Sequence, residues 1–322
     1  MVDTTTSPHY ITEHWKNEIK QVLDDSLSLR NEIMWWTGDF PNGDILNVPT
    51  MGQLTVRDYV EGANITLEDT ASQNFTLTID KYKQTGIQIT DKMKQDSSYI
   101  NMLISKYKVE VVAALMRQLE SDIAHLQASQ TASNPNNIDG QDHRFVSVGV
   151  NNTGSDEDFK LAMLSLSVSK AMTSASSAFI TPEVLYRLQG ISNLLSQDVY
   201  GTNQLLKEGG LIGKVIMAAQ ESRKLVGTIA GFQTYSHNDL DLNLSETITA
   251  TSGTPFTTGT VTAGKANMFL GRETFVGAMR TDPDIVEFRK EEIKSDVIHA
   301  TTRYGLKLYR PESLVVCLTD AS

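Results

Sequence analysis

The segment that decides the fold runs from Phe75 to Leu126 and reads FTLTIDKYKQTGIQITDKMKQDSSYINMLISKYKVEVVAALMRQLESDIAHL. Its first part alternates apolar and polar residues, as Phe75, Leu77 and Ile79 do with the threonines between them. This period of two predicts a strand with one face against apolar material. From about Asp96 the apolar residues recur every three or four positions without Pro or Gly, which predicts an amphipathic helix. It would contain roughly thirty residues and measure on the order of 45 Å, so we expect the other elements to pack around it.

A long ribbon precedes this helix. Residues 45 to 90 contain strand-like stretches separated by a turn at Glu61 to Asn64 and a polar segment at Glu68 to Asn74. They predict a hairpin that carries little apolar material of its own. Because an isolated two-stranded hairpin is marginally stable in water, we expect another surface to cover it. That surface is either a sheet elsewhere in the chain or another molecule.

The N-terminal region reads as a polar tail, a short amphipathic helix from Trp15 to Leu27 and an apolar cluster from Ile33 to Trp36. Two interpretations of this region remain open. The helix either packs on the core of its own chain, or the region forms an arm that lies against a neighbouring subunit.

The chain after the long helix predicts a mixed domain of helices and strands. Ser155 is placed to cap a helix with acidic residues in its first turn, and Thr181-Pro182 begins a second helix. A short helix is predicted at Glu273 to Met279, followed by a break at Asp282-Pro283. A strand pair broken by Gly227 and Gly231 is predicted at Val226–Tyr235. Single strands are predicted at Phe145–Val150, Ala178–Ile180, Met268–Leu270, Ile285–Phe288, Ile293–Thr301, Leu306–Tyr309 and Leu314–Leu318. The fold class is therefore α+β, in two domains or one large one.

The composition restricts the function classes. The chain has 322 residues and a net charge of −11, which is unfavourable for tight non-specific DNA binding because such binding needs Lys and Arg. Its single cysteine, Cys317, excludes an internal disulfide framework and fits a reducing compartment. The polar N-terminus has no signal-peptide core, and no apolar run reaches the ~18 residues of a membrane span. We expect a protein made in the cytosol.

The sequence shows no recognisable catalytic, metal or cofactor site. The six histidines are scattered without metal-ligand spacing, and Cys317 lies in an apolar strand. Gly259 to Lys265 matches the phosphate-binding pattern GxxxxGK, but Ala266 stands where a Mg²⁺-binding hydroxyl is needed and no apolar strand precedes it. Asp239, Asp241 and Asn243 are spaced as in a calcium loop, but the glycine and bidentate acid of such a loop are missing. We therefore expect no cofactor, metal or catalytic residue.

The order of the elements, with several local motifs, resembles the major capsid proteins of tailed bacteriophages, whose fold is named after phage Hong Kong 97. VPTMGQLTVRDYVEG (48–62) and FTLTIDKYKQTGIQITDKMKQ (75–95) are similar to the two limbs of the family's E-loop hairpin. FITPEVLYRL (179–188) and GTIAGFQTYSHNDL (227–240) resemble parts of its axial domain. IKSDVIHATTRYGLKLYRPESLVV (293–316) resembles its closing strands, with Arg303, Gly305, Arg310 and Pro311 at the recurring Arg, Gly and Arg-Pro positions.

The resemblance implies four regions of a Hong Kong 97-type fold. They are an N-terminal arm (1–44), an E-loop hairpin (45–90), a peripheral domain with the spine helix (91–154 and 281–305) and an axial domain (155–280 and 306–322). No long helical N-terminal extension is present to serve as a built-in scaffold, so a separate scaffolding protein, or none, is implied. No Lys–Asn cross-linking pair can be placed; Lys81 and Lys83 lie at the hairpin base without an identifiable acid opposite them.

The function implied by the resemblance is that of a non-enzymatic major capsid protein in the virion. Copies would assemble as hexamers and pentamers into an icosahedral head around double-stranded DNA, with portal and scaffolding proteins as partners and room for a cement protein. The alternatives are an encapsulin-like cellular shell and, from another class, a soluble enzyme with an unrecognised site. The residues expected at subunit interfaces are Trp35, Trp36, Leu54, Arg57, Tyr59, Ile65, Phe75, Arg303 and Arg310. For Arg57, Lys92, Arg303 and Arg310, an intramolecular or surface ion pair is an equal alternative.

Overall fold

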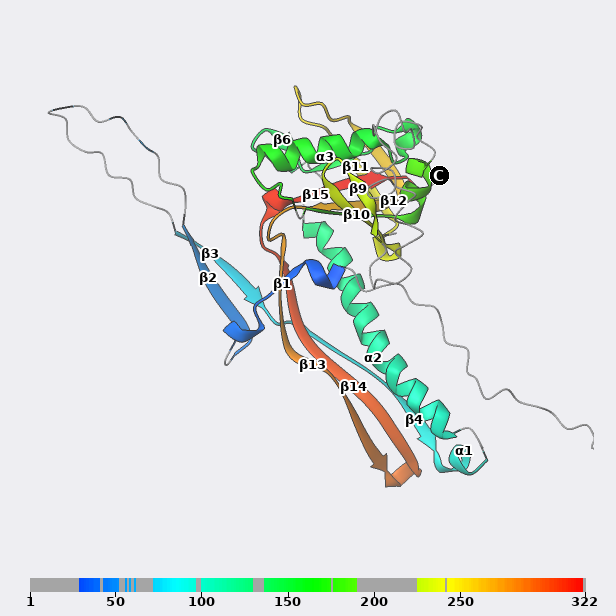
Figure 1. Ribbon diagram of the computed structural model, residues 1–322. Coiled ribbons are helices and arrows are strands. Elements are labelled where there is room, and N and C mark those ends of the chain that lie inside the picture. The colour runs from blue at the N-terminus through cyan, green and yellow to red at the C-terminus, as the bar shows by residue number, and fades with distance from the viewer. Residues whose placement is uncertain are drawn as a thin grey trace, which may run out of the picture.

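The computed structural model describes residues 29–40, 43–51, 56, 58, 61, 72–96, 100–129, 136–174, 176–189, 225–240 and 242–320. Figure 1 shows two parts joined end to end, with a two-stranded hairpin projecting from the region between them. One part consists of long strands and the long helix, and the other of shorter strands covered by helices. The expected α+β class is confirmed.

The elongated part is a four-stranded sheet with one helix across it. The strand order is β1–β13–β14–β4, with β1 parallel to β13 and the other pairs antiparallel. Helix α2 packs on this sheet because Val111 and Leu115 bury their side chains against Ala300 of β14. The elements are β1 (Ile33–Trp35), β4 (Lys81–Thr90), α1 (Asp91–Asp96), α2 (Ile100–Ala124), β13 (Phe275–Lys290), η8 (Glu291–Ile293) and β14 (Ser295–Leu308).

The compact part is a sheet of the order β7–β15–β12–β8–β10–β9, with β11 paired to β12. Helix α3 covers one face, where Phe159 packs edge-on against Phe269 at 5.0 Å between ring centroids. The end of α2 enters the opposite face, where Leu119 and Ile123 share a cluster with Phe179. The elements are β7 (Arg144–Val146), α3 (Asp156–Val168), β8 (Ser177–Ile180), α4 (Pro182–Gln189), β9 (Leu225–Ile229), β10 (Phe232–Ser236), β11 (Leu244–Ile248), β12 (Gly259–Leu270) and β15 (Leu314–Thr319).

Short elements connect these layers. The hairpin consists of β2 (Ile45–Met51) and β3 (Ser72–Thr78). The remaining pieces are η2 (Leu29–Glu32), η3 (Thr37–Asp39), η4 (His125–Ser129), β5 (Asn137–Ile138), β6 (Gln141–Asp142), η5 (Val150–Asn152), η7 (Asn238–Leu240) and η9 (Pro311–Ser313).

Several local predictions are confirmed. The long helix is present as α2 with 25 residues, about 37 Å at 1.5 Å per residue. Ser155 caps α3 in a capping box with Asp158, and Pro182 opens α4. Gly231 turns the chain between β9 and β10 at a φ of +85°, a backbone conformation that favours glycine.

Other local predictions are wrong. Glu273 to Met279 is not a helix, because β13 begins at Phe275 and pairs with both β1 and β14. The strand also continues through Pro283, where its ladder shifts register between Thr281 and Asp284. Residues 81–90, assigned to the hairpin, form β4 and pair with β14 instead. The predicted helix at Trp15 to Leu27 lies outside the described residues, and the domain boundaries stay a prediction.

Candidate subunit interface

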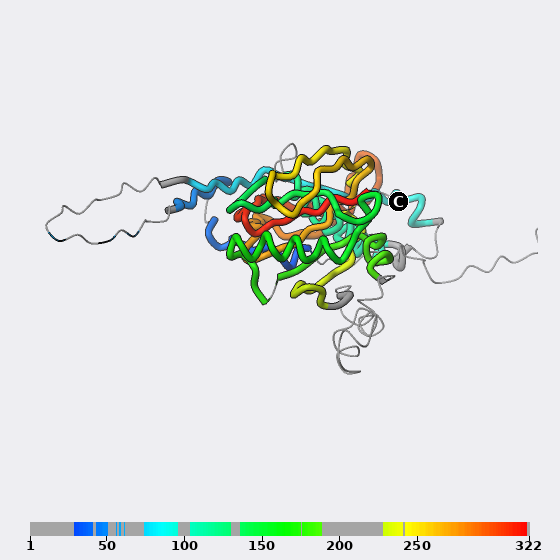
Figure 2. The backbone as a smooth tube through the Cα atoms, turned by 90° about the horizontal axis from the view of Figure 1, so that it is seen from above, coloured from blue at the N-terminus to red at the C-terminus, as the bar shows by residue number. Residues whose placement is uncertain are grey.

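The hairpin β2–β3 forms a two-stranded sheet of its own, separate from the two larger sheets. Its strands pair antiparallel from Ile45–Thr78 at the base to Met51–Ser72 farther out. Among the described strands, none pairs with either outer edge. Two views at right angles show that it leads away from both sheets (Figures 1 and 2). A strand edge of this kind is available to another chain.

The base of the hairpin is fixed to the body by an aromatic cluster. Trp36, Phe75 of β3 and Tyr309 pack edge-to-face, with ring centroids 5.1 to 6.1 Å apart. The Lys307 ammonium lies 4.9 Å from the Phe75 ring centroid and donates to the Thr76 carbonyl oxygen at 2.7 Å. Each such aromatic pair is worth about 0.5–1.5 kcal/mol beyond its burial. The hairpin therefore leaves the body in a defined direction.

The predicted interface residues in the described part of the chain all make contacts within it. Trp35 lies in β1 opposite Gly277, while Trp36 and Phe75 belong to the aromatic cluster. Arg303 forms an ion pair with Asp44, and Arg310 pairs with Glu273 at 3.1 Å and Glu312 at 3.6 Å. The intramolecular alternative thus applies to both arginines. Lys92 is exposed on α1, and Leu54, Arg57, Tyr59 and Ile65 lie outside the described residues. Contact of any of these residues with a second copy stays a prediction.

Glu120 anchors the chain just before the hairpin, and the sequence pattern did not indicate it. Its buried carboxylate on α2 accepts hydrogen bonds from the backbone N–H groups of Leu29 and Arg30, both at 3.0 Å. The Nε2 atom of His237 lies 3.3 Å from the same carboxylate. Asp239 N–H donates to His237 Nδ1, so the proton of a neutral imidazole lies on Nε2 and points to Glu120. One side chain therefore joins the arm, α2 and the compact part.

Asp122 of α2 makes a second junction. Its carboxylate accepts from the Tyr304 hydroxyl at 2.7 Å and pairs with Lys81 at 3.0 Å. Burial alone would raise the pKa of Asp122, but the hydrogen bonds from Tyr304 and Lys81 outweigh it and lower the pKa. Burial and the bond to Asp122 raise the pKa of Tyr304. These contacts hold α2 against β4 and β14.

The candidate chemical motifs have structural roles. Gly259 to Lys265 is not a loop but the start of β12, and the buried Lys265 forms an ion pair with Glu183 of α4. Burial raises the pKa of the Cys317 thiol and lowers that of His143. Within the described ranges, no three His, Cys, Asp or Glu side chains are grouped to hold a metal ion. None of the helices described there is long and apolar enough to cross a membrane.

Comparison with known proteins places this geometry in a fold family. No family model matches the chain, and no curated protein matches it by sequence. Among solved structures, the Cyanophage Pam1 capsid asymmetric unit matches with a TM-score of 0.69 and 13% identity, covering 99% of each chain. The chain has the fold of tailed-phage capsid proteins.

Two further structures agree with this capsid fold. A chain from Mycobacterium phage Che8 matches with a TM-score of 0.67 and 16% identity, covering 96% of this chain and 97% of that one. The capsid structure of Cyanophage P-SCSP1u matches with a TM-score of 0.66 and 15% identity, covering 98% and 94%. The phage capsid fold expected from the sequence is confirmed. At these identities the likeness establishes the fold and assigns no residue a role.

Proposed function

We propose that this chain is a major capsid protein that self-assembles as hexamers and pentamers into an icosahedral phage head enclosing double-stranded DNA. The observation that carries the proposal is the hairpin β2–β3, which has no partner among the described strands and leads away from the body. The capsid fold, matched over nearly the whole of each compared chain, supports the same function.

Within the part of the chain that the structure describes, the hairpin is attached to the body only at its base. Its base is held by the Trp36–Phe75–Tyr309 cluster, while the sequence of the ribbon predicts little apolar material of its own. Laying this part across a second copy supplies the surface that a two-stranded ribbon needs in water. Such a contact uses two different surfaces, so its repetition generates closed rings or extended arrays rather than a dimer. Modest contacts repeated around each subunit then add to a robust shell.

The charge fits a container for DNA. A net charge of −11 limits adsorption of packaged DNA to the wall, since non-specific binding requires Lys and Arg to displace phosphate counterions. We propose a non-enzymatic role, in which portal and scaffolding proteins are the partners outside the shell lattice. An encapsulin-like shell would use the same hairpin and differ in its content, because its particles would hold cargo protein instead of DNA.

A hairpin-shortening variant tests the proposal. Residues 52–71 are replaced by Asn-Gly, a two-residue turn that keeps every β2–β3 pair from Ile45–Thr78 to Met51–Ser72. We expect a folded subunit with the circular dichroism and melting temperature of the wild type, but no shells in negative-stain microscopy or sedimentation.

The matched control keeps the length of residues 52–71 and scrambles their order, which separates the reach of the hairpin from its side-chain contacts. Shells of normal size and yield from the shortened variant would overturn the role of the hairpin. If the wild type itself forms no closed particles under any assembly condition, the capsid function fails as a whole.

A further inference from the structure

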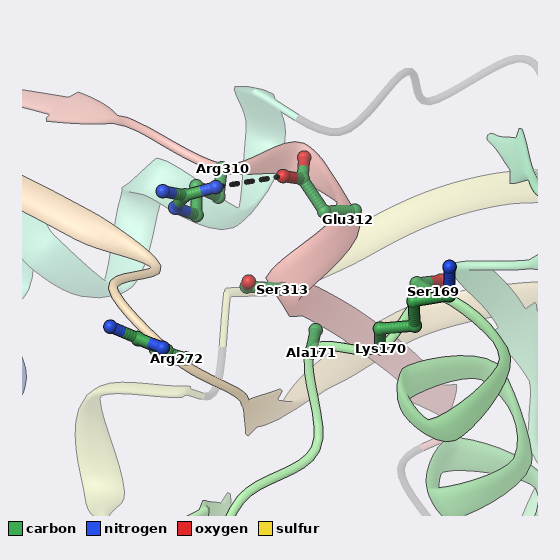
Figure 3. A pocket seen from close by; sticks show the side chains of 7 residues that line it. All are labelled: Ser169, Lys170, Ala171, Arg272, Arg310, Glu312 and Ser313. Carbon is green, nitrogen blue, oxygen red and sulfur yellow. Dashed lines mark ion pairs between the residues drawn. The ribbon is translucent and has the colours of Figure 1, made fainter. Parts of the chain in front are cut away.

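A polar cavity of about 230 Å³ opens in the compact part, where three chain segments meet. The segments are the end of α3, the turn after β12 and η9, and Figure 3 shows their side chains around the opening. Gly271 N–H donates to the Ser313 carbonyl at 2.8 Å, and Arg272 N–H donates to the Ala171 carbonyl at 3.1 Å. A Cβ at Gly271 would lie 2.7 Å from that Ala171 oxygen, so the close approach requires glycine. The lining residues are Ser169, Lys170, Ala171, Arg272, Arg310, Glu312 and Ser313.

Three basic side chains, Lys170, Arg272 and Arg310, line the cavity, although the chain as a whole is acidic. Arg310 is engaged by Glu273 and Glu312, whereas Arg272 is 71% exposed and lies 3.4 Å from a single Glu273 oxygen. The exposed Lys170 forms no ion pair with any residue that the structure describes. It follows the C-terminus of α3, the helix end that favours a cation. The cavity can therefore accept a carboxylate from outside.

The opposite end of α3 carries the complementary charge. Asp156 and Glu157 lie in its first turn, about 20 Å from Lys170 along the 13-residue helix. Both pair with Lys160, so the half-buried Asp156 and the exposed Glu157 share one base. Nearby, Asn152 holds the Asp320 carboxylate at 2.8 Å, which adds a further acid at the end where the chain terminates (Figure 1). The compact part thus has a basic end and an acidic end.

The basic end lies beside the base of the hairpin. Arg310 directly follows Tyr309, and its guanidinium lies 5.3 Å from the Tyr309 ring centroid. Tyr309 in turn packs against Phe75 of β3. The cavity therefore adjoins the surface from which the hairpin leaves the body.

We propose that this cavity receives the acidic first turn of α3, with Glu157 at its centre, from a second copy of this chain. The inference rests on the proposed function and names the contact that orients neighbouring subunits in a ring. Because the two surfaces differ and lie at opposite ends of one helix, the contact is head-to-tail, as a closed hexamer or pentamer requires. Complementary charge at its rim sets the register and the rate of association.

A charge swap tests the contact. Lys170→Glu and Glu157→Lys are made separately and together, and assembly is followed by sedimentation velocity and negative-stain microscopy. Each single variant should need a several-fold higher subunit concentration to assemble, because like charges then meet at the contact. The combined variant has the net charge of the wild type and should assemble at close to its concentration. Melting of the unassembled subunits shows whether each variant is folded.

The matched control is Lys294→Glu. Lys294 is also an exposed lysine with a positive φ, 45° against 59° for Lys170, but it lies at the far tip of the elongated sheet. Normal assembly of Lys170→Glu overturns the inference, and so does an equal defect in Lys294→Glu or a combined variant that is not restored. Loss of bound DNA from normally assembled Lys170→Glu shells would instead assign the cavity to phosphate. In all these cases the wild type still forms shells, so the proposed function is judged separately.

Discussion

At the residue scale, Glu120 shows how one buried carboxylate connects distant segments. It lies on α2 between Leu119 and Ser121 and accepts two backbone N–H groups from the arm while facing His237. A buried charge is tolerated when several donors surround it, and removing it leaves those donors unpaired. Its role is therefore structural: it fixes Leu29 and Arg30 of the arm to α2.

We predict that Glu120→Gln lowers the free energy of unfolding by about 1–3 kcal/mol, because one amide cannot replace both carboxylate oxygens. Chemical denaturation of the unassembled subunit measures this change. Glu110→Gln is the control on the same helix, since Glu110 pairs with Arg117 at the surface and such pairs contribute about 0–1 kcal/mol. Equal effects of the two substitutions would contradict the anchoring role.

A pH dependence follows from Asp122. Its pKa in the folded chain lies below the ordinary value of 3.8, so the contacts of its carboxylate stabilise the fold above that pH. This contribution is lost as the pH falls through the lowered pKa. We expect Asp122→Asn to be less stable than the wild type at neutral pH and to lose less stability on acidification. Denaturation at a series of pH values below 5 measures the difference, and parallel curves would refute the assignment.

At the element scale, the packing of α2 gives a direct prediction. Leu119 is buried in the cluster where α2 meets the sheet of the compact part, whereas Val109 is 60% exposed on the same helix. Leu119→Ala should lower the free energy of unfolding by about 2–5 kcal/mol, because a cavity remains in a packed core. Val109→Ala should change it by no more than about 0.5 kcal/mol. Thermal and chemical denaturation of both variants provide the comparison.

The elements that sequence could predict are those whose two faces differ. Helix α2 has one apolar stripe, and α3 has a cap and acidic first turn, so both were predicted near their observed positions. The start of strand β13 was wrongly predicted as a helix because this part of the strand is buried on both faces. Phe275 and Met279 enter one cluster, while Val276 and Ala278 enter another. Apolar residues at this spacing also occur in a helix. Only the pairing with β1 and β14 decides between helix and strand.

At the scale of the whole molecule, the sequence predicted an uncovered ribbon but not its attachment. A lack of apolar residues is visible locally, whereas the contact of Trp36 and Phe75 with Tyr309 joins residues from distant parts of the chain. For the charged residues, contact with a second copy stays a prediction. Arg303 and Arg310 have acidic partners in their own chain, and periodicity carries no information about such partners.

The labelling rate of one introduced thiol reports whether the hairpin is covered in an assembled shell. Cys317 is buried and its thiol pKa is raised, so the wild-type subunit should react little with maleimide. Val56, within the hairpin segment, is 95% exposed, so Val56→Cys adds one accessible thiol. We expect its labelling rate to fall several-fold on assembly, since a neighbouring copy then covers it. Val109→Cys, on the exposed side of α2, is the matched reporter and should label equally in subunit and shell. Unchanged labelling at position 56 would mean that the hairpin remains in solvent, and copies would then have to be joined by other surfaces.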